Sequence, residues 1–225
     1  MAVVNVRQPG LRSPVSSVFP PICGPEGRWA FFLAPVLMGA KASVSLNLSA
    51  SSEDLPYLPQ LLSVTRLSAR LLWPHGPEQL WLIYDPAALE RSLNQTLTRN
   101  WLRQAGYPLQ SGLAALLDHL CLNFRQQGGF PHELGFFLDY TPEDVLGYIQ
   151  WGGQAAKYCG CWKVYGDLDQ ARLRFSLIQN CRRQACLLLQ QGLPLLPLCQ
   201  HLAGSLRLLP PPVCDGYPVP AAAEA

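Results

Sequence analysis

Length, composition and charge set the first limits on this protein. The chain has 225 residues, of which 49% are hydrophobic and 14% are charged, with a formal net charge of +2. This hydrophobic content is sufficient for the core of one soluble domain. The sparse and nearly balanced charge excludes a general electrostatic surface for nucleic acid or for an anionic membrane, so partners must be inferred from local features.

The N-terminal part of the chain predicts a cytoplasmic protein. Its main apolar run, 29–38, contains Pro35 and is far shorter than the roughly 20 residues that a membrane-spanning helix needs. Residues 1–27 carry Arg7, Arg12 and scattered prolines, without the continuous apolar segment of a secretory signal. We therefore expect no membrane span. We also expect the eight cysteines to be reduced, so that their spacing reflects metal binding, redox chemistry or burial.

Proline-rich ends flank a single predicted domain. Prolines recur through 1–28 and again through 205–225, where the chain ends in alanines and a glutamate. Such a composition is typical of disordered segments. We predict a disordered extension over 1–28, one globular domain of unknown function over 29–204, and a disordered Pro/Ala-rich tail over 205–225.

Three segments early in that domain have the pattern of strands. Residues 42–49 alternate polar and apolar side chains, and 67–73 and 79–84 flank Pro74-His75-Gly76-Pro77. A period of two is typical of a half-buried strand, and the proline and glycine punctuation suits a hairpin loop. The short aromatic segment 161–165 predicts a further strand.

Helix signals dominate the rest of the chain. Asp85-Pro86 indicates a helix start, and an apolar stripe follows it, with a break expected near Asn94. An amphipathic pattern over 113–124 predicts a second helix, and 168–191 predicts a long one that ends before Gly192. The predicted fold class is α+β or α/β, with a small mixed sheet of about four strands and about six helices in a single domain.

Residues 130–167 contain most of the chemically unusual side chains. Pro131-His132-Glu133 predicts one short helix, and Thr141-Pro142-Glu143-Asp144 predicts a second, in which we interpret Thr141 as the cap and the two acids as complements of the helix dipole. Two short helices in succession resemble a DNA-reading helix-turn-helix. Residues 131–151 contain no lysine or arginine, however, so phosphates would be repelled and we expect no DNA binding.

The candidates for ligand binding in this segment are His132, Glu133, Lys163 and Tyr165. A histidine titrates near neutral pH and can carry a proton or bind a metal, although adjacent helical residues do not face each other, so His132 and Glu133 alone form no dyad. The structural alternative is a hydrogen bond at the helix start. In a strand, Lys163 and Tyr165 point to one side. They line either a pocket or an ordinary polar surface.

The candidate metal ligands are Cys159, Cys161 and Cys181. One glycine separates the first two, and soft thiolates suit iron or zinc. Structural zinc sites commonly use Cys-x-x-Cys pairs, however, and Cys181 continues an apolar stripe with Phe175 and Ile178, as a core cysteine does. Both the metal or redox hypothesis and simple burial stay open at this level.

The long helix carries a basic face. Its arginines are Arg172, Arg174, Arg182 and Arg183, and no acid occurs between Gln170 and Gln191. We expect this face to be solvated or docked against the acidic residues between Glu133 and Asp144.

The motifs of residues 131–165 resemble those of a bacterial family of unknown function found in anaerobic Gram-positive bacteria. The similarity rests on Pro131-His132-Glu133-Leu134-Gly135, on Pro142-Glu143-Asp144-Val145 with Gly147, and on Gly160-Cys161-Trp162-Lys163-Val164-Tyr165, and in weaker form it spans 29–193. The resemblance implies a flavodoxin-like or iron-transport partner, and hence redox or iron physiology. Members often carry a cysteine just before Ala34-Pro35. Because this chain has Leu33 there, a metal site that used that thiol would lack one ligand.

Three functions are compatible with these features. The favoured hypothesis is a small cytoplasmic accessory module that binds a ligand, a metal or a redox partner where the helix start at His132 approaches the strand 159–165. An alternative is a thiol-dependent enzyme with Cys159 or Cys161 as nucleophile and His132 as base, although the common catalytic motifs are missing from the sequence. The third is a pure protein-interaction module that uses the acidic helix pair or the arginine face.

Overall fold

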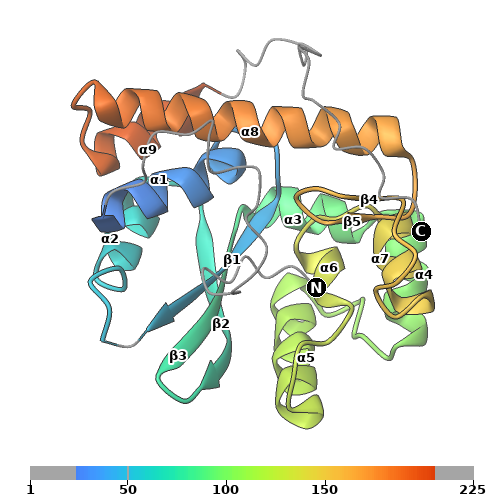
Figure 1. The fold of residues 1–225 in the computed structure, drawn as a ribbon. Coiled ribbons are helices and arrows are strands. Elements are labelled where there is room, and N and C mark those ends of the chain that lie inside the picture. Colours follow the sequence, from blue (N-terminus) through green and yellow to red (C-terminus); the bar gives the residue numbers. More distant parts are fainter. Residues whose placement is uncertain (1–23, 50, 206–225) are drawn as a thin grey trace.

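A three-stranded antiparallel sheet lies between two groups of helices. The computed structural model describes residues 24–49 and 51–205, and the sheet has the order β1-β3-β2 (Figure 1). Its strands are β1 (Ser43–Ser49), β2 (Ser68–His75) and β3 (Glu78–Tyr84). The α+β class is confirmed, and the three strands fall where the sequence pattern predicted them. The sheet is antiparallel rather than mixed, because β3 pairs with both neighbours in the antiparallel sense.

A tight hairpin joins β2 to β3. Gly76 has φ 62°, a left-handed conformation that a residue without Cβ adopts easily and that suits a two-residue hairpin turn. The turn is therefore shorter than the loop predicted over 74–77. The register of β2 shifts between Leu71 and Trp73, which marks a bulge, and Pro74 follows in the same strand. Both irregularities lie in an edge strand, where they are tolerated.

Helices make up most of the remainder, and the described residues contain nine of them, against about six predicted. They are α1 (Gly24–Leu37), α2 (Tyr57–Val64), α3 (Pro86–Leu93), α4 (Thr96–Gln104), α5 (Gly112–Gln127), α6 (Leu134–Phe137), α7 (Pro142–Gln150), α8 (Leu168–Gln190) and α9 (Leu195–Gly204). The break expected near Asn94 separates α3 from α4. The N-terminal helix starts at Gly24, before the predicted boundary at 28; the predicted disordered ends otherwise lie outside the described residues.

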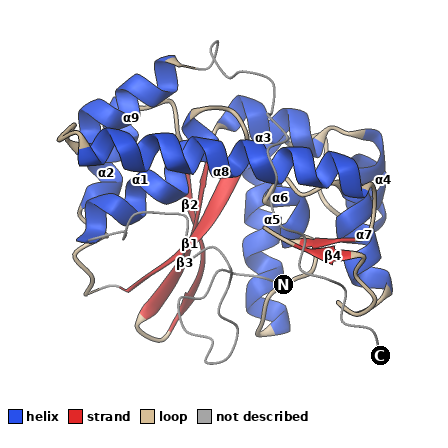
Figure 2. Cartoon of the chain, turned by 45° about the horizontal axis from the view of Figure 1, so that its top comes forward, coloured by secondary structure: helices blue, strands red, loops and turns tan. Residues whose placement is uncertain are grey.

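Two hydrophobic clusters cover opposite faces of the sheet. Along β3, Leu80 and Leu82 pack with α3, α5 and α6, whereas Ile83 packs with α1, α8 and α9. This alternation follows from the period of two in a strand with both faces buried. The long helix α8 runs across the molecule from α1 to the region of β4 and α7 (Figures 1 and 2).

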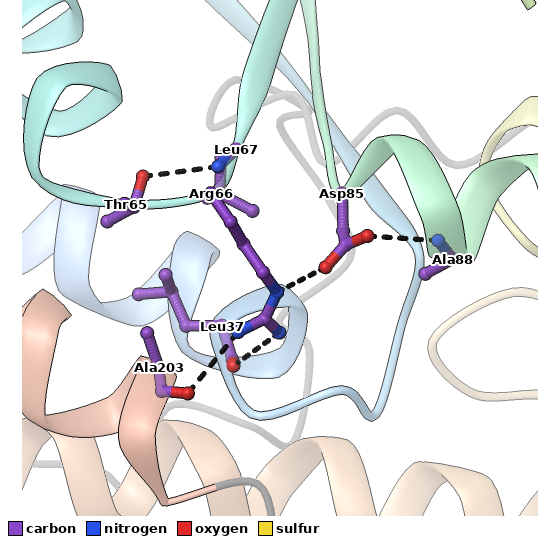
Figure 3. A network of polar contacts seen from close by, with 7 residues as sticks. All are labelled: Leu37, Thr65, Arg66, Leu67, Asp85, Ala88 and Ala203. Carbon is purple, nitrogen blue, oxygen red and sulfur yellow. Dashed lines mark hydrogen bonds and ion pairs between the residues drawn. The ribbon is translucent and has the colours of Figure 1, made fainter.

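Arg66, in the connection before β2, links three elements (Figure 3). Its side chain donates to the carbonyl of Leu37 at the end of α1 (3.0 Å), to that of Ala203 in α9 (3.3 Å), and to the carboxylate of Asp85. Asp85 also caps α3 by accepting from the backbone N–H of Ala88 at 2.9 Å, as the sequence predicted. Burial opposes ionisation of Asp85, but these bonds outweigh it and hold the pKa of Asp85 below its usual value.

A second, minimal sheet forms near the end of α7. It pairs β4 (Tyr158–Cys159) with β5 (Lys163–Val164). The strand predicted over 161–165 is therefore shorter and separate from the main sheet, because residues 160–162 form the loop of this hairpin. In the part of the chain that the structure describes, no helix combines the length and the apolar character needed to cross a membrane.

Candidate functional site

Asp144 holds the β4–β5 hairpin against α7. The residue is only 3% exposed, and its carboxylate accepts hydrogen bonds from the indole Nε1 of Trp162 (2.7 Å) and from the backbone N–H groups of Tyr165 (2.7 Å) and Gly166 (2.8 Å). A buried carboxylate needs such donors to offset its lost hydration. Asp144 is thus a packing residue between two elements.

The capping interpretation needs a correction at the start of α7. Thr141 is the N-cap residue, but its side chain makes no capping hydrogen bond. Glu143 is exposed and Asp144 lies in the same first turn, so both can complement the helix dipole. The prediction was incomplete for Asp144, because its carboxylate also accepts three hydrogen bonds from the hairpin and the residue that follows it.

Two motif glycines permit the close approach of neighbouring elements. A Cβ on Gly147 in α7 would lie 2.4 Å from Cβ of Tyr165, and one on Gly160 would lie 2.3 Å from the ring of Phe175 on α8. Contacts this short do not occur between real atoms of these types. The hairpin is therefore packed against both helices at distances that only glycine allows.

The hairpin divides its side chains between two faces. Trp162 and Val164 are buried, whereas Lys163 and Tyr165 keep part of their surface exposed. This confirms the alternation predicted from strand geometry. On the buried face, the Trp162 ring stacks on Tyr140 with centroids 4.7 Å apart and meets Phe175 edge-on at 4.5 Å.

His132 and Lys163 line a common recess. The recess has a volume of about 30 Å³ and is bordered by the turn before α6, by α7 and by the hairpin. Its lining residues are His132, Gly135, Tyr140, Asp144, Val145, Tyr148, Trp162 and Lys163. The His132 ring lies 5.5 Å from that of Tyr148, and Nζ of Lys163 donates to the carbonyl of Gly153 at 2.6 Å. The structure thus brings together two of the predicted ligand-binding residues.

Tyr165 and Glu133 lie elsewhere. The hydroxyl oxygen of Tyr165 is buried without a hydrogen-bond partner, and its residue does not line the recess. Glu133 points into the core, where its carboxylate accepts from the hydroxyl of Tyr107 (3.0 Å) and from the amide of Asn123 (2.7 Å). Burial raises the pKa of Tyr107, and the Glu133 charge adds to the effect. His132 and Glu133 diverge, so the structure gives Glu133 a role in packing α5 against the α6 turn.

The three candidate thiols differ in exposure. Cys159 is exposed, Cys161 is partly buried and Cys181 is fully buried. Within 24–49 and 51–205, no three side chains of histidine, cysteine, aspartate or glutamate group together as metal ligands. Iron or zinc at these thiols therefore stays a prediction for elemental analysis. Burial raises the pKa of Cys181 to about 11, which is the behaviour of a core thiol.

Part of the arginine face is docked against the acidic residues between Glu133 and Asp144, which was one of the two expectations for it. Arg174 donates to Asp139 at 2.7 Å, and Arg172 pairs with Asp169 on its own helix at 3.5 Å. Arg183 is exposed. Asp139, with φ 58°, also accepts from the backbone N–H of Ala42 at 3.0 Å and from Ser92 at 2.7 Å, so it connects the α6–α7 turn to α8, to α3 and to the residue before β1.

Sequence reasoning missed Tyr148 as a recess residue and Asp144 as the residue that fixes the hairpin. One signal was available, since positions 144 and 148 are four apart and share a helix face, with Val145 beside them. The partners of that face could not be read from the sequence, because they come from a hairpin of two-residue strands.

Fold and site together define a small α+β protein whose most distinctive segment forms a tightly packed unit around a small recess that His132 and Lys163 help to line. Over residues 30–199 the chain matches the family described as "Protein of unknown function (DUF3793)", and it belongs to that family. This confirms the resemblance to a family of unknown function. Comparisons with curated proteins and with solved structures gave no match.

Proposed function

We propose that this protein is a small binding module that receives one polar end group of a larger ligand or partner in the recess between His132, Tyr148 and Lys163. The supporting observation is the convergence of His132 and Lys163, from separate elements, on one recess. A volume of about 30 Å³ is comparable to that of a single water molecule. Pockets that enclose whole metabolites are about tenfold larger, so the size favours docking over the turnover of a small substrate.

The chemistry of the recess favours an acceptor group. Lys163 offers an ammonium group that one backbone carbonyl satisfies only in part, since an ammonium has three donors. His132 is exposed and can donate or accept according to its protonation. A carboxylate or carbonyl at the end of a partner side chain would match this pair. By family resemblance, the first partners to test are flavodoxin-like and iron-transport proteins, in the cytoplasm.

The test is a titration of the ¹⁵N-labelled protein with purified flavodoxin and with a purified iron-transport protein. We expect amide shifts around His132, Tyr148 and Lys163, and an affinity about tenfold weaker in Lys163→Met and in His132→Gln, as for the loss of one charge-assisted hydrogen bond. Lys157→Met is the matched control, because Lys157 also donates to a backbone carbonyl beside the hairpin, that of Gly166 at 2.8 Å. Equal binding by Lys163→Met and Lys157→Met would reject the recess as the contact.

A second candidate function is thiol chemistry at Cys159. This cysteine is exposed and pairs directly across the hairpin with Lys163, so both side chains emerge on the same face. The structure therefore favours Cys159 over Cys161 as the nucleophile of this alternative. Fast alkylation of Cys159 by iodoacetamide at pH 6, with a slower rate in His132→Gln, would support thiol chemistry at this residue. An alkylation rate equal to that of a free thiol in solution would count against it.

A further inference from the structure

A group of positive charges surrounds the Tyr140–Trp162 ring stack where α1 ends. Nζ of Lys41 lies 5.1 Å from the ring centroid of Tyr140 and 6.0 Å from that of Trp162. Cζ of Arg174 lies 5.4 Å from the Trp162 ring, and Cζ of Arg182 lies 4.4 Å from the Phe31 ring of α1. We call Lys41, Arg174 and Arg182 the cation cluster. It is formed by one residue from the connection between α1 and β1 and by two residues from α8.

The cation cluster has more positive charge than its carboxylates compensate. Asp139 pairs with Arg174 at 2.7 Å. Among the described residues, no salt bridge includes Lys41 or Arg182. Burial lowers the pKa of Lys41 to about 8 against the attraction of Asp139, and the charges of Arg182 and Arg174 lower it further. Partly desolvated cations without counter-charges are costly, so a bound anion would stabilise this arrangement.

The neighbouring thiol does not supply the missing negative charge. Cys161 lies in the hairpin loop beside Arg182, and Gln179 Nε2 approaches its sulfur at 3.9 Å. Burial raises the pKa of the Cys161 thiol, although Arg182 and Lys41 oppose the shift. At neutral pH the thiol is therefore protonated, and it leaves the charge of Lys41 and Arg182 uncompensated.

Two unsatisfied polar atoms lie in the same place. Nε of Arg182 is a buried donor without a partner, and Oε1 of Gln179 is a buried acceptor without one. The two residues are three positions apart on α8, so their side chains share a face. Most buried polar atoms in proteins are paired, and each exception calls for an explanation. A ligand that both accepts and donates hydrogen bonds would satisfy the two atoms together.

We propose that Lys41, Gln179 and Arg182 form a binding site for hydrogen phosphate. Its anionic oxygens accept from the guanidinium and ammonium groups, and its P–OH group donates to Oε1 of Gln179. Neither sulfate nor a dianionic phosphate ester has such a donor, so the site should bind free hydrogen phosphate in preference to both. All three residues are only partly buried, although Nε of Arg182 and Oε1 of Gln179 are themselves inaccessible in the ion-free structure. The site involves none of the polar groups of the His132–Lys163 recess and does not depend on the binding function proposed for it.

The small number of lysines gives a direct readout. The chain contains three, Lys41, Lys157 and Lys163, so protein labelled with ¹³C at the lysine ε-carbon gives three side-chain signals, and Lys41→Met assigns that of Lys41. Phosphate at constant ionic strength is expected to shift the Lys41 signal and to raise the pKa of Lys41 from about 8, because the anion favours the charged amine. A Lys41 pKa unaffected by phosphate would overturn the proposal.

Variants of residues on α8 provide a second test of the phosphate site. Arg182→Gln is expected to weaken phosphate binding at least about tenfold, and the exposed neighbour Arg183 is the matched control as Arg183→Gln. If Arg182→Gln fails to fold, Gln179→Glu serves instead, because the added carboxylate would repel the anion. Equal phosphate affinity in these variants and in Arg183→Gln would also reject the site, and sulfate binding as tight as phosphate binding would reject the role of Gln179.

Discussion

Asp144 and Trp162, 18 positions apart in the chain, are joined by a 2.7 Å hydrogen bond from the indole N–H to the carboxylate. Through this bond, and through two backbone N–H groups that bind the other oxygen, one buried acid sets the position of the whole β4–β5 hairpin. Lys163 lies on that hairpin, so its place in the recess depends on Asp144 as well as on its own contacts. Asp144 and Lys163 both line the recess.

Asp144→Asn should destabilise the fold by roughly 2 to 4 kcal/mol. An amide has one acceptor oxygen, so its nitrogen would face either the indole N–H or the two backbone N–H groups, and donors would then oppose donors. Urea unfolding followed by circular dichroism measures the change. Glu143→Gln, at the exposed adjacent position, is the control and should stay within about 0.5 kcal/mol of the parent protein. Equal stability of the two variants would contradict the role of Asp144.

Gly147→Ala should also destabilise the hairpin unit. Alanine gains about 1 kcal/mol over glycine in helix propensity, but its Cβ would lie 2.4 Å from Cβ of Tyr165, an atom fixed to the backbone. Overpacking of this kind costs up to about 3 kcal/mol, so we expect a net loss of about 2 kcal/mol. Gly129→Ala, where a Cβ meets nothing within 4 Å, is the control in the same unfolding experiment. A stabilised Gly147→Ala protein would show that the two elements are not in close contact.

The sequence predicted the regular elements well, for physical reasons that particular residues illustrate. Asp85-Pro86 starts α3 and Gly128, with φ 62°, ends α5, because caps and glycine breaks act through local backbone chemistry. The main strands follow from alternating burial. The pairing of β4 with β5 depends instead on contacts with Asp144 and Phe175, which lie on other elements. A local pattern cannot specify such partners, and the strand predicted over 161–165 was accordingly too long.

The same distinction explains the site predictions. His132 and Lys163 were selected for their chemistry and their neighbourhood, and the structure places them on one recess. Glu133 was selected because it is adjacent to His132, but its carboxylate binds Tyr107 and Asn123 in the core. The cation cluster escaped sequence reasoning because Lys41 and Arg182 are distant in the chain and carry no motif between them.

Arg66→Met should lower the free energy of unfolding by about 1 to 2 kcal/mol. The change leaves the buried carboxylate of Asp85 without its cation and two helix carbonyls, of Leu37 and Ala203, without a donor (Figure 3). Arg70→Met is the matched control, since the Arg70–Asp118 pair has side chains 42% and 61% exposed and should contribute less than about 1 kcal/mol. Thermal unfolding of both variants separates the two cases. A larger loss of stability in Arg70→Met than in Arg66→Met would contradict the role of Arg66.

Lys41 should make a contribution to stability that increases with pH in the alkaline range. Its folded pKa is about 8 against an ordinary value of 10.5, so between these values the unfolded chain binds the proton more tightly and the free energy of unfolding rises with pH. The gain is at most about 3 kcal/mol. The charged groups that face Lys41 are Asp139, Arg174 and Arg182, with Cys161 as a further titratable neighbour. The buried thiols of Cys161, Cys181 and Cys199 have raised pKa values and contribute a slope of the opposite sign. Denaturant unfolding in phosphate-free buffer at several pH values should therefore show a more positive slope in the parent protein than in Lys41→Met, and the difference between the two slopes is the contribution of Lys41.

The thiols should react in a fixed order. Among the six cysteines that the structure describes, Cys159 is exposed and should be alkylated first in the folded protein, and Cys161 should follow slowly because it is partly buried and protonated. The buried thiols, Cys121, Cys181, Cys186 and Cys199, should react only when the protein unfolds. Peptide mass spectrometry after timed alkylation identifies each site, and rapid labelling of Cys181 in the native protein would contradict the packing of α8. Elemental analysis of the same preparation tests for iron or zinc.

The bulge between Leu71 and Trp73 and the proline that follows it have a consequence for solubility. An edge strand with a regular row of free N–H and C=O groups can recruit a strand from another molecule and grow into an aggregate. In β2 the register shift breaks that row, and Pro74 has no N–H to offer. A second chain approaching this edge would therefore find no continuous ladder to extend, so the irregular strand protects the sheet from self-association on that side.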